Sequence, residues 1–144
     1  MILAKITAED GSVIELAEDN EQGNFLTSVD IQFNTPDSNV KQKPKAMLAK
    51  ITITGKIETN KNDLKPLYKA LFDWSKSLDK NQGYRTVDIE IKEDDTNDDS
   101  FRKYHFEKMF VVDYREFYSG NNEENLFELE LLQYENNFKT IETY

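Results

Sequence analysis

The sequence predicts a mainly β protein: an antiparallel barrel or sandwich of about seven strands, with one α-helix between the fourth and fifth. Apolar and polar residues alternate along seven segments, which is the spacing of a strand with one buried face. Only residues 62–78 place apolar residues at helical spacing. Short polar segments separate most of the strands, which favours antiparallel hairpins over parallel crossovers.

The first two strands form a predicted hairpin. Residues 2–7 alternate, Asp10-Gly11-Ser12 predicts a turn, and residues 13–16 return. A third strand is expected over residues 25–33, with one row formed by Phe25, Thr27, Val29, Ile31 and Phe33. The fourth strand, residues 48–57, has an apolar row that ends Ile51, Ile53, Gly55, Ile57. Gly55 indicates a bulge or a close backbone approach.

The helix is expected between Asn62 and Leu78, capped by Asn62 or Asp63, with Pro66 in its first turn. Phe72 lies off the apolar stripe, which indicates a contact on a second side. The stripe itself consists of Leu64, Leu67, Tyr68, Leu71, Trp74, Ser75 and Leu78. Trp74 is interpreted as a core residue.

Three strands follow, at residues 84–92, 101–118 and 126–134. The middle one is unusually long and has apolar residues on both faces around Met109–Val112, which predicts a strand that is covered on both sides or bends there. In that strand the even row includes Tyr104, Phe106, Phe110, Val112, Tyr114 and Tyr118. Residues 135–144 are expected to be a tail, and residues 1–144 one domain.

Composition restricts the function classes. The 144 residues include 18 Lys and Arg against 28 Asp and Glu, a formal charge of −10, which disfavours phosphate backbones and anionic lipid. Lys41, Lys43 and Lys45 are a local exception, interpreted as solvated. No apolar run reaches the roughly 20 residues needed to span a bilayer. We expect no signal peptide, no membrane partner and no nucleic-acid binding.

Candidate chemistry is sparse. There is no cysteine and a single histidine, His105, which alternation places on a polar strand face. Asp95, Asn97 and Asp99 resemble the start of a calcium loop, but its sixth and twelfth positions are Ser100 and Phe106 instead of glycine and glutamate. Carboxylate pairs such as Asp113 with Glu116 arise by chance among so many acids. We therefore expect no catalytic residue, no metal site and no cofactor.

One irregular segment stands out as a functional candidate. Residues 34–45 interrupt two strong strands with two prolines and alternating lysines, and loops of this length in a compact domain are often functional. A surface excursion without a role is the other interpretation of the same residues.

Several segments together resemble a known family: Ile51-Thr-Ile-Thr-Gly55-Lys-Ile57, Tyr84 to Ile91, Arg102-Lys-Tyr-His-Phe106, Met109 to Tyr114, and Phe127 to Gln133. With their order around the helix, they resemble the phage tail-tube and type VI haemolysin-coregulated tube proteins, including small Gram-positive proteins sometimes labelled membrane-associated protease. The resemblance covers roughly residues 2–134.

The resemblance implies a self-assembling ring, hexameric in the family, that stacks into a tube of a phage-tail-like or contractile injection particle. It implies partners among further copies and among sheath or baseplate proteins, with assembly in the cytoplasm. It also implies that the irregular segment reaches a neighbouring subunit. This predicted assembly loop contains Asn34, Pro36, Asp37, Asn39, Lys41, Lys43, Pro44 and Lys45.

Two alternatives remain open at this point. The first is a monomeric binding or baseplate module of the same particle class, binding cell wall or carbohydrate. Tyr104, Tyr114, Phe117 and Tyr118 could form an aromatic strip for it, although core packing is the favoured interpretation of these rings. The second is a hydrolase, which the lack of a nucleophile–base pair disfavours. The ring size and the identity of any cargo are not encoded in a recognisable pattern.

Overall fold

The computed structural model describes residues 1–17, 26–34, 48–60, 64–77, 83–93, 100–120, 124–133 and 142–143. Within these ranges the mainly β prediction is confirmed, with seven long strands and one α-helix. The elements in chain order are β1 (Ile2–Thr7), β2 (Val13–Ala17), β3 (Leu26–Asn34), β4 (Leu48–Lys56), α2 (Lys65–Lys76), β5 (Arg85–Lys92), β6 (Ser100–Phe117), β7 (Leu126–Gln133) and β8 (Glu142–Thr143).

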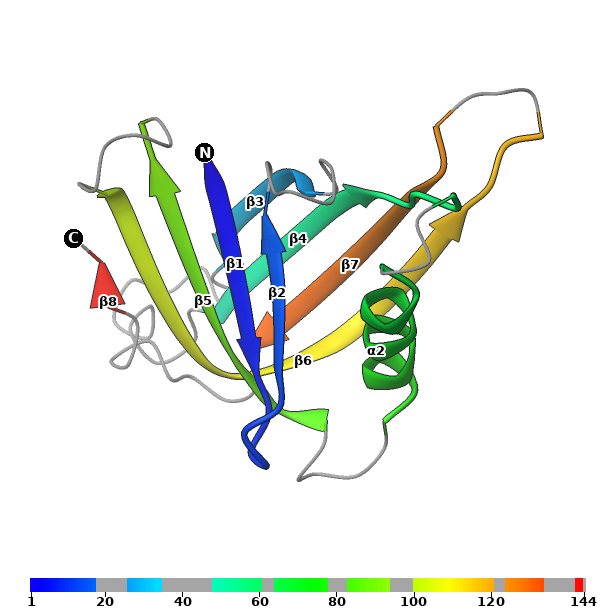
Figure 1. Ribbon diagram of the computed structural model, residues 1–144. Helices are drawn as coiled ribbons and strands as arrows, with labels where there is room; N and C mark the ends of the chain where they lie inside the picture. Colours follow the sequence, from blue (N-terminus) through cyan, green and yellow to red (C-terminus); the bar gives the residue numbers. More distant parts are fainter. Residues whose placement is uncertain are drawn as a thin grey trace.

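The described strands form one sheet in the order β2-β1-β5-β6-β7-β4-β3, with β8 beside β6 (Figure 1). Every pairing is antiparallel. The long strand β6 connects the two halves of the sheet, because its first part pairs with β5 and its second part with β7. This arrangement brings the N-terminal hairpin next to a strand that lies about eighty residues further along the chain.

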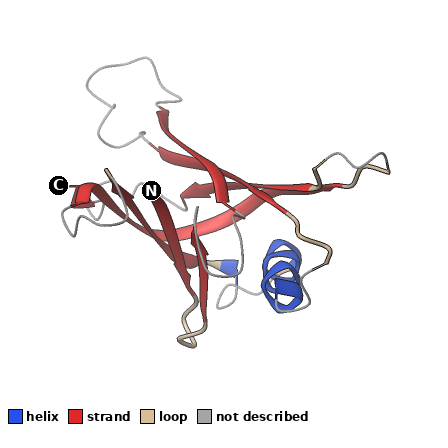
Figure 2. Ribbon diagram, turned by 45° about the horizontal axis from the view of Figure 1, so that its top comes forward, coloured by secondary structure: helices blue, strands red, loops and turns tan. Residues whose placement is uncertain are grey.

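The sheet curls so that its two halves face each other at an angle, and α2 lies across the open side (Figure 2). The helix contacts β6 and β2, and β1 approaches β3. Leu71 and Trp74 are the buried residues of the helix. The curled sheet and the helix together enclose an apolar core, because the inward rows of all seven long strands meet there.

The apolar rows expected for the fourth, fifth and last long strands are confirmed as core. Ile51, Ile53 and Leu129 are fully buried, as are their neighbours in the same rows. β7 also directs one polar side chain inward: Gln133 is 2% exposed and its Nε2 donates to the backbone oxygen of Glu107 over 3.4 Å. The alternation of these strands therefore predicts their buried face correctly.

The predicted bend in the long strand is confirmed, and two irregularities cause it. The β5–β6 register shifts between Val87 and Arg85, beside Lys108, whose φ is +56°. The β6–β7 register shifts again at Val112. Each extra residue reverses the alternation, so the core-facing side chains run Phe106, Met109, Val111 and then Tyr114. The prediction that the even-numbered residues share one face is therefore wrong between residues 108 and 112. Phe110 is not among the core-facing residues, and Val112 is exposed.

The row predicted for β3 also requires a correction. A register shift makes Thr27 an extra residue in β3. Leu26 pairs with Gly55 and Ser28 pairs with Thr54, so Thr27 lies between these two pairs. Leu26, which was outside the predicted row, is buried at 1% exposure. Thr27 is exposed and its hydroxyl donates to the carbonyl oxygen of Thr54 over 2.9 Å. The odd-numbered row is therefore correct only from Val29 onward; Phe25 lies outside the described residues.

The helix begins at Lys65 rather than residue 62. Leu64 occupies the N-cap position without a side-chain cap, and a proline (Pro66) lies in the first turn as expected. The caps predicted at Asn62 and Asp63 lie outside the described residues. Without a capping side chain, the stability of this helix depends on packing of its apolar face.

The C-terminal segment differs from the expected tail. Glu142 and Thr143 form β8, which pairs with His105 and Tyr104 of β6. Residues 134–141 and 144 lie outside the described part of the chain. A two-residue strand on the open edge of β6 could not be predicted, because its only determinant is a partner strand distant in sequence.

Candidate assembly surfaces

A face of alternating charges covers the outer side of β2, β1, β5 and β6, opposite the core. Its central row crosses the four strands in register as Glu15, Lys5, Asp88 and His105. A parallel row contains Ala17, Leu3, Glu90 and Lys103. Opposite charges beside each other on neighbouring strands stabilise a sheet by fractions of a kcal/mol per pair, about 0.2–1. We call these two rows the outer charged face.

The outer charged face is hollowed. A depression of about 390 Å³ lies over the two rows, and Lys5, Glu15, Asp88, Lys103 and His105 contribute to its lining. Small or aliphatic residues form part of its floor, including Leu3 and Ala17. The depression therefore combines an apolar floor with side chains of both charges.

His105 lies at the β6 end of this face. Its Nδ1 lies 2.5 Å from Oδ1 of Asp88, and its Nε2 lies 3.4 Å from Oε1 of Glu107. Partial burial alone would lower the pKa of His105, but hydrogen bonds and charges from Asp88 and Glu107 outweigh it and raise the pKa above the ordinary 6.5. The histidine is on the polar face, as predicted, and it bridges two carboxylates there.

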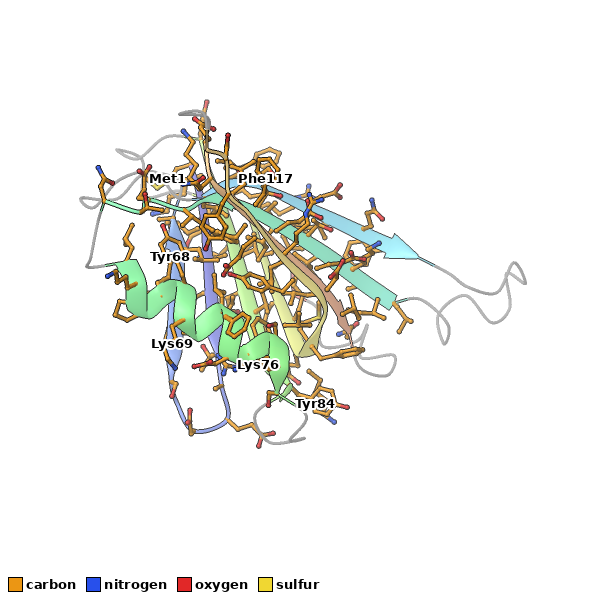
Figure 3. All side chains as sticks on the ribbon, turned by 90° about the vertical axis from the view of Figure 1, so that its right-hand side faces the viewer. Met1, Tyr68, Lys69, Lys76, Tyr84 and Phe117 are labelled. Atoms are coloured by element: carbon orange, nitrogen blue, oxygen red, sulfur yellow. The ribbon has the colours of Figure 1, made fainter. Side chains whose placement is uncertain are left out.

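A second surface lies at the far end of β6, where aromatic side chains reach solvent. Phe72 of α2 packs edge-on against Tyr114, with ring centroids 6.4 Å apart, and Lys76 lies over the Phe72 ring at 4.6 Å. Phe117 and Tyr118 are 52% and 57% exposed. Figure 3 shows Phe117 at the opposite end of the sheet from Tyr84, with Lys69 and Lys76 along the helix. We call Phe72, Tyr114 and Tyr118 the distal aromatic cluster; alternation places Phe117 on the opposite face of β6 from Tyr114.

A carboxylate joins two rings of the distal aromatic cluster. The hydroxyls of Tyr114 and Tyr118 each donate to one oxygen of Glu116, both over 2.7 Å. Burial, followed by the Glu116 hydrogen bond, raises the pKa of Tyr114; the Glu116 hydrogen bond raises the pKa of Tyr118 to about 12. Glu116 therefore links the two phenols and contributes to the raised pKa of each.

The predicted aromatic strip is not one strip. Tyr104 stacks on Phe106 at 5.7 Å and, like Tyr114, packs against the core. Only Phe117 and Tyr118 of the four are largely exposed. The bend in β6 separates Tyr104 from the other three, and alternation places Phe117 on the opposite face of the strand from Tyr114, so the four rings do not form one continuous surface.

The end strands of the sheet offer a third kind of surface. Within the described residues, β2 and β3 stand at the two ends of the strand order, each paired with one neighbour. Strand ends of this type can accept another strand, which proteins manage by covering or pairing them. β3 is nine residues long and continues to Asn34, the first residue of the predicted assembly loop.

The described part of the chain includes only the first residue of that loop, Asn34. Pro36, Asp37, Asn39, Lys41, Lys43, Pro44 and Lys45 lie outside the described residues, as do Asp95, Asn97 and Asp99. Among the residues that the structure does describe, no group of three or more His, Asp or Glu side chains is arranged to hold a metal ion. In the same ranges, no helix combines the length and the apolar character needed to cross a membrane.

Sequence reasoning missed the outer charged face and the Glu116 bridge. Alternation does place Lys5, Asp88 and His105 on outward rows, but their adjacency depends on the pairing of β1 with β5 and β5 with β6. The spacing of Tyr114, Glu116 and Tyr118 at every second position was a usable signal for a shared face.

Comparison with known proteins gives the fold. No protein-family model and no curated protein matches the sequence. The structure is similar to the sheath/tube terminator of the PVC extracellular contractile injection system, with a TM-score of 0.57, 14% identity, and 99% and 92% of the two chains covered. It is also similar to the Hcp1 protein of E. coli EAEC 042, with a TM-score of 0.52 and 13% sequence identity. That match covers 99% of this chain and 96% of the Hcp1 chain. The chain has the Hcp-like tube fold.

A third solved structure with this tube fold comes from another part of such a particle. The anti-feeding prophage baseplate, determined with six-fold symmetry, contains a chain with a TM-score of 0.55 and 10% identity, covering 99% of this chain and 91% of that one. The tube fold therefore accounts for nearly the whole chain. At these identities the likeness concerns the fold.

Proposed function

We propose that this protein is a self-assembling ring or tube subunit of a phage-tail-like or contractile injection particle. The observation that carries the proposal is that structures of a tube terminator, an Hcp1 protein and a baseplate each match almost the full chain. The role proposed is structural rather than catalytic. Six copies per ring are proposed because the baseplate structure has six-fold symmetry.

Three surfaces of the described chain support assembly. The end strands β2 and β3 can extend the sheet into a neighbouring copy, and a closed ring removes exposed strand edges. The distal aromatic cluster offers apolar area next to α2. The outer charged face offers both signs of charge, which orient partners more than they strengthen binding.

The assembly loop of residues 34–45 is proposed to contact the neighbouring subunit. It follows β3, an end strand, and it carries three lysines in a chain of formal charge −10. Positive charge at that point complements the acidic surface that every other copy presents. Sheath or baseplate proteins are the further partners proposed, with assembly in the cytoplasm before incorporation into the particle.

Light scattering across a concentration series, combined with negative-stain electron microscopy, tests the proposal. We expect rings of uniform diameter, or stacked rings, at high concentration. Replacement of residues 35–45 by a glycine–serine linker of equal length should abolish them while far-ultraviolet circular dichroism stays unchanged. The same replacement at residues 94–99, between β5 and β6, is the matched control and should leave assembly intact.

A baseplate or binding module of the same particle class is the second candidate. The likeness to a baseplate chain and the exposure of Phe117 and Tyr118 favour it. It predicts a monomer at every concentration, with rings absent in the microscope. Under that outcome, binding of purified cell-wall fragments and its loss in the double variant Phe117→Ser, Tyr118→Ser would decide for the module.

A further inference from the structure

We propose that His105, Asp88 and Glu107 form a pH-dependent clasp that stabilises the junction of β5 and β6 in mildly acidic solution and releases it as the solution becomes alkaline. The clasp is defined by contacts of one imidazole with two carboxylates, at 2.5 Å and 3.4 Å. Asp88 belongs to β5, whereas His105 and Glu107 belong to β6. A protonated imidazole thus joins both strands through two charged hydrogen bonds.

The clasp lies next to the bend of β6. Glu107 directly precedes Lys108, where the positive φ and the register shift begin the bend of β6. The backbone oxygen of Glu107 also accepts from the buried Gln133 of β7. His105 therefore acts on a residue that contacts both halves of the curled sheet, so its charge affects how firmly the first half is held at the bend.

Among the described charged groups, only Asp88 and Glu107 contact the imidazole, and the other charged groups of the outer charged face lie further along its two rows. Lys5 of β1 and Glu15 of β2 continue the row through Asp88, and the register of β8 places Glu142 opposite His105. Glu90 and Lys103 form the neighbouring cross-strand pair. These groups are Lys5 and Lys103 against Glu15, Asp88, Glu90 and Glu107. Acids outnumber cations around the ring, which favours its protonated form.

The direction of the pH effect follows from the raised pKa of His105. A group that binds its proton more tightly in the folded chain contributes stability that is fully present below its unfolded pKa, near 6.5, and is lost as pH rises through the folded value. Each pH unit by which the folded pKa exceeds the unfolded pKa changes the folding equilibrium constant about tenfold. The imidazole is partly exposed, so salt reduces the effect. No other histidine and no cysteine titrates in this range.

Nuclear magnetic resonance of the imidazole protons tests the clasp directly, because the untagged chain has one histidine. In the full chain we expect a midpoint above 6.5, and Asp88→Asn should lower it by about half a pH unit or more. Glu107→Gln should lower it less, because its oxygen is further away. Asp113→Asn, on the same strand beyond the bend and opposite Glu130, is the control and should leave the midpoint nearly unchanged.

Urea unfolding of wild type and His105→Gln at about pH 5.5 and about pH 9 provides the stability measurement. At pH 5.5 the wild type should unfold at a higher urea concentration than His105→Gln. The difference between the two urea midpoints should be smaller at pH 9. A histidine midpoint at or below 6.5 would overturn the clasp, as would an equal difference at both pH values. Light scattering must give the same oligomeric state at both pH values, so that the result is independent of the proposed assembly.

Discussion

The indole nitrogen of Trp74 donates a hydrogen bond to the backbone oxygen of Gly83 over 3.0 Å. This contact ties the buried face of α2 to the chain that leads into β5. The guanidinium of Arg85 lies over the same indole, 5.1 Å from its centroid. Burial lowers the pKa of Arg85, although the negative charge of Asp10 partly opposes that change. Trp74 thus joins the buried face of the helix to the start of β5 by both a hydrogen bond and a ring contact.

Replacement of Trp74 by phenylalanine removes the hydrogen bond and leaves unfilled volume beside the core. We expect a loss of about 2–4 kcal/mol in the free energy of unfolding. Urea unfolding, monitored by far-ultraviolet circular dichroism, measures this loss. Tryptophan fluorescence cannot be used because the variant lacks the only tryptophan of the chain. Phe72→Leu, two residues earlier and 44% exposed, is the control and should cost about 1 kcal/mol or less. Equal losses would contradict the buried role of Trp74.

The two leucines at the end of β7 test the assignment of the sheet faces. Leu131 is fully buried, whereas Leu132 is on the opposite face and only partly covered. Leu131→Ala should cost about 2–5 kcal/mol, and Leu132→Ala less than half of that. Both variants are compared with wild type by urea unfolding under the same buffer. A larger loss for Leu132→Ala than for Leu131→Ala would mean that the opposite face of β7 packs against the core.

Lys108 has a φ of +56°, which glycine adopts more readily than lysine does. Its side chain is exposed, so the substitution removes little packing. Lys108→Gly should therefore leave the free energy of unfolding unchanged or raise it by up to about 1 kcal/mol. Lys108→Val, with a β-branched side chain in the same conformation, should lower it by about 1–2 kcal/mol. The pair is measured by thermal and urea unfolding; a valine variant as stable as the glycine variant would exclude strain at the bend.

Glu116 is the chief cause of the raised pKa of Tyr118. The pKa of Tyr118 is raised to about 12, chiefly by its hydrogen bond to Glu116. Glu116→Gln removes the negative charge, so Tyr118 should ionise at lower pH, closer to the ordinary 10.0. Ultraviolet difference titration of each protein against its Tyr118→Phe partner isolates this one phenol. Circular dichroism at each pH confirms that the chain is still folded, and an unchanged midpoint would show that Glu116 does not contact the phenol in solution.

The raised pKa values of the two phenols also set a pH limit on stability. A tyrosine that holds its proton more tightly in the folded chain stabilises it below pH 10.0 and loses that contribution as pH rises through the folded value. In wild type this loss falls above the working range of most buffers. Substitution of Glu116 moves it toward pH 10.0, in the same direction as the absorbance change.

Alternation alone determined much of this fold. Ile51, Ile53 and Ile57 are buried as their spacing predicts, and so are Val87, Ile89 and the apolar row of β7. The helical spacing of Leu71 and Trp74 likewise identified the buried face of α2. These predictions succeed because one buried face requires one apolar row, and the row is visible within a single segment. For β6, apolar residues on both faces near Met109 indicated either a strand covered on both sides or a bend, and the structure shows the bend.

Only the tertiary structure decided where the rows break and which strands meet. The extra residues at Thr27, Lys108 and Val112 arise from hydrogen bonding to a partner strand, which no single segment encodes. The bridge between Asp88 and His105 likewise depends on the register of two strands joined by a loop, and the row through Lys5 depends on a strand more than eighty residues away. Local sequence determines which face of a strand is apolar; long-range pairing determines which charges become neighbours.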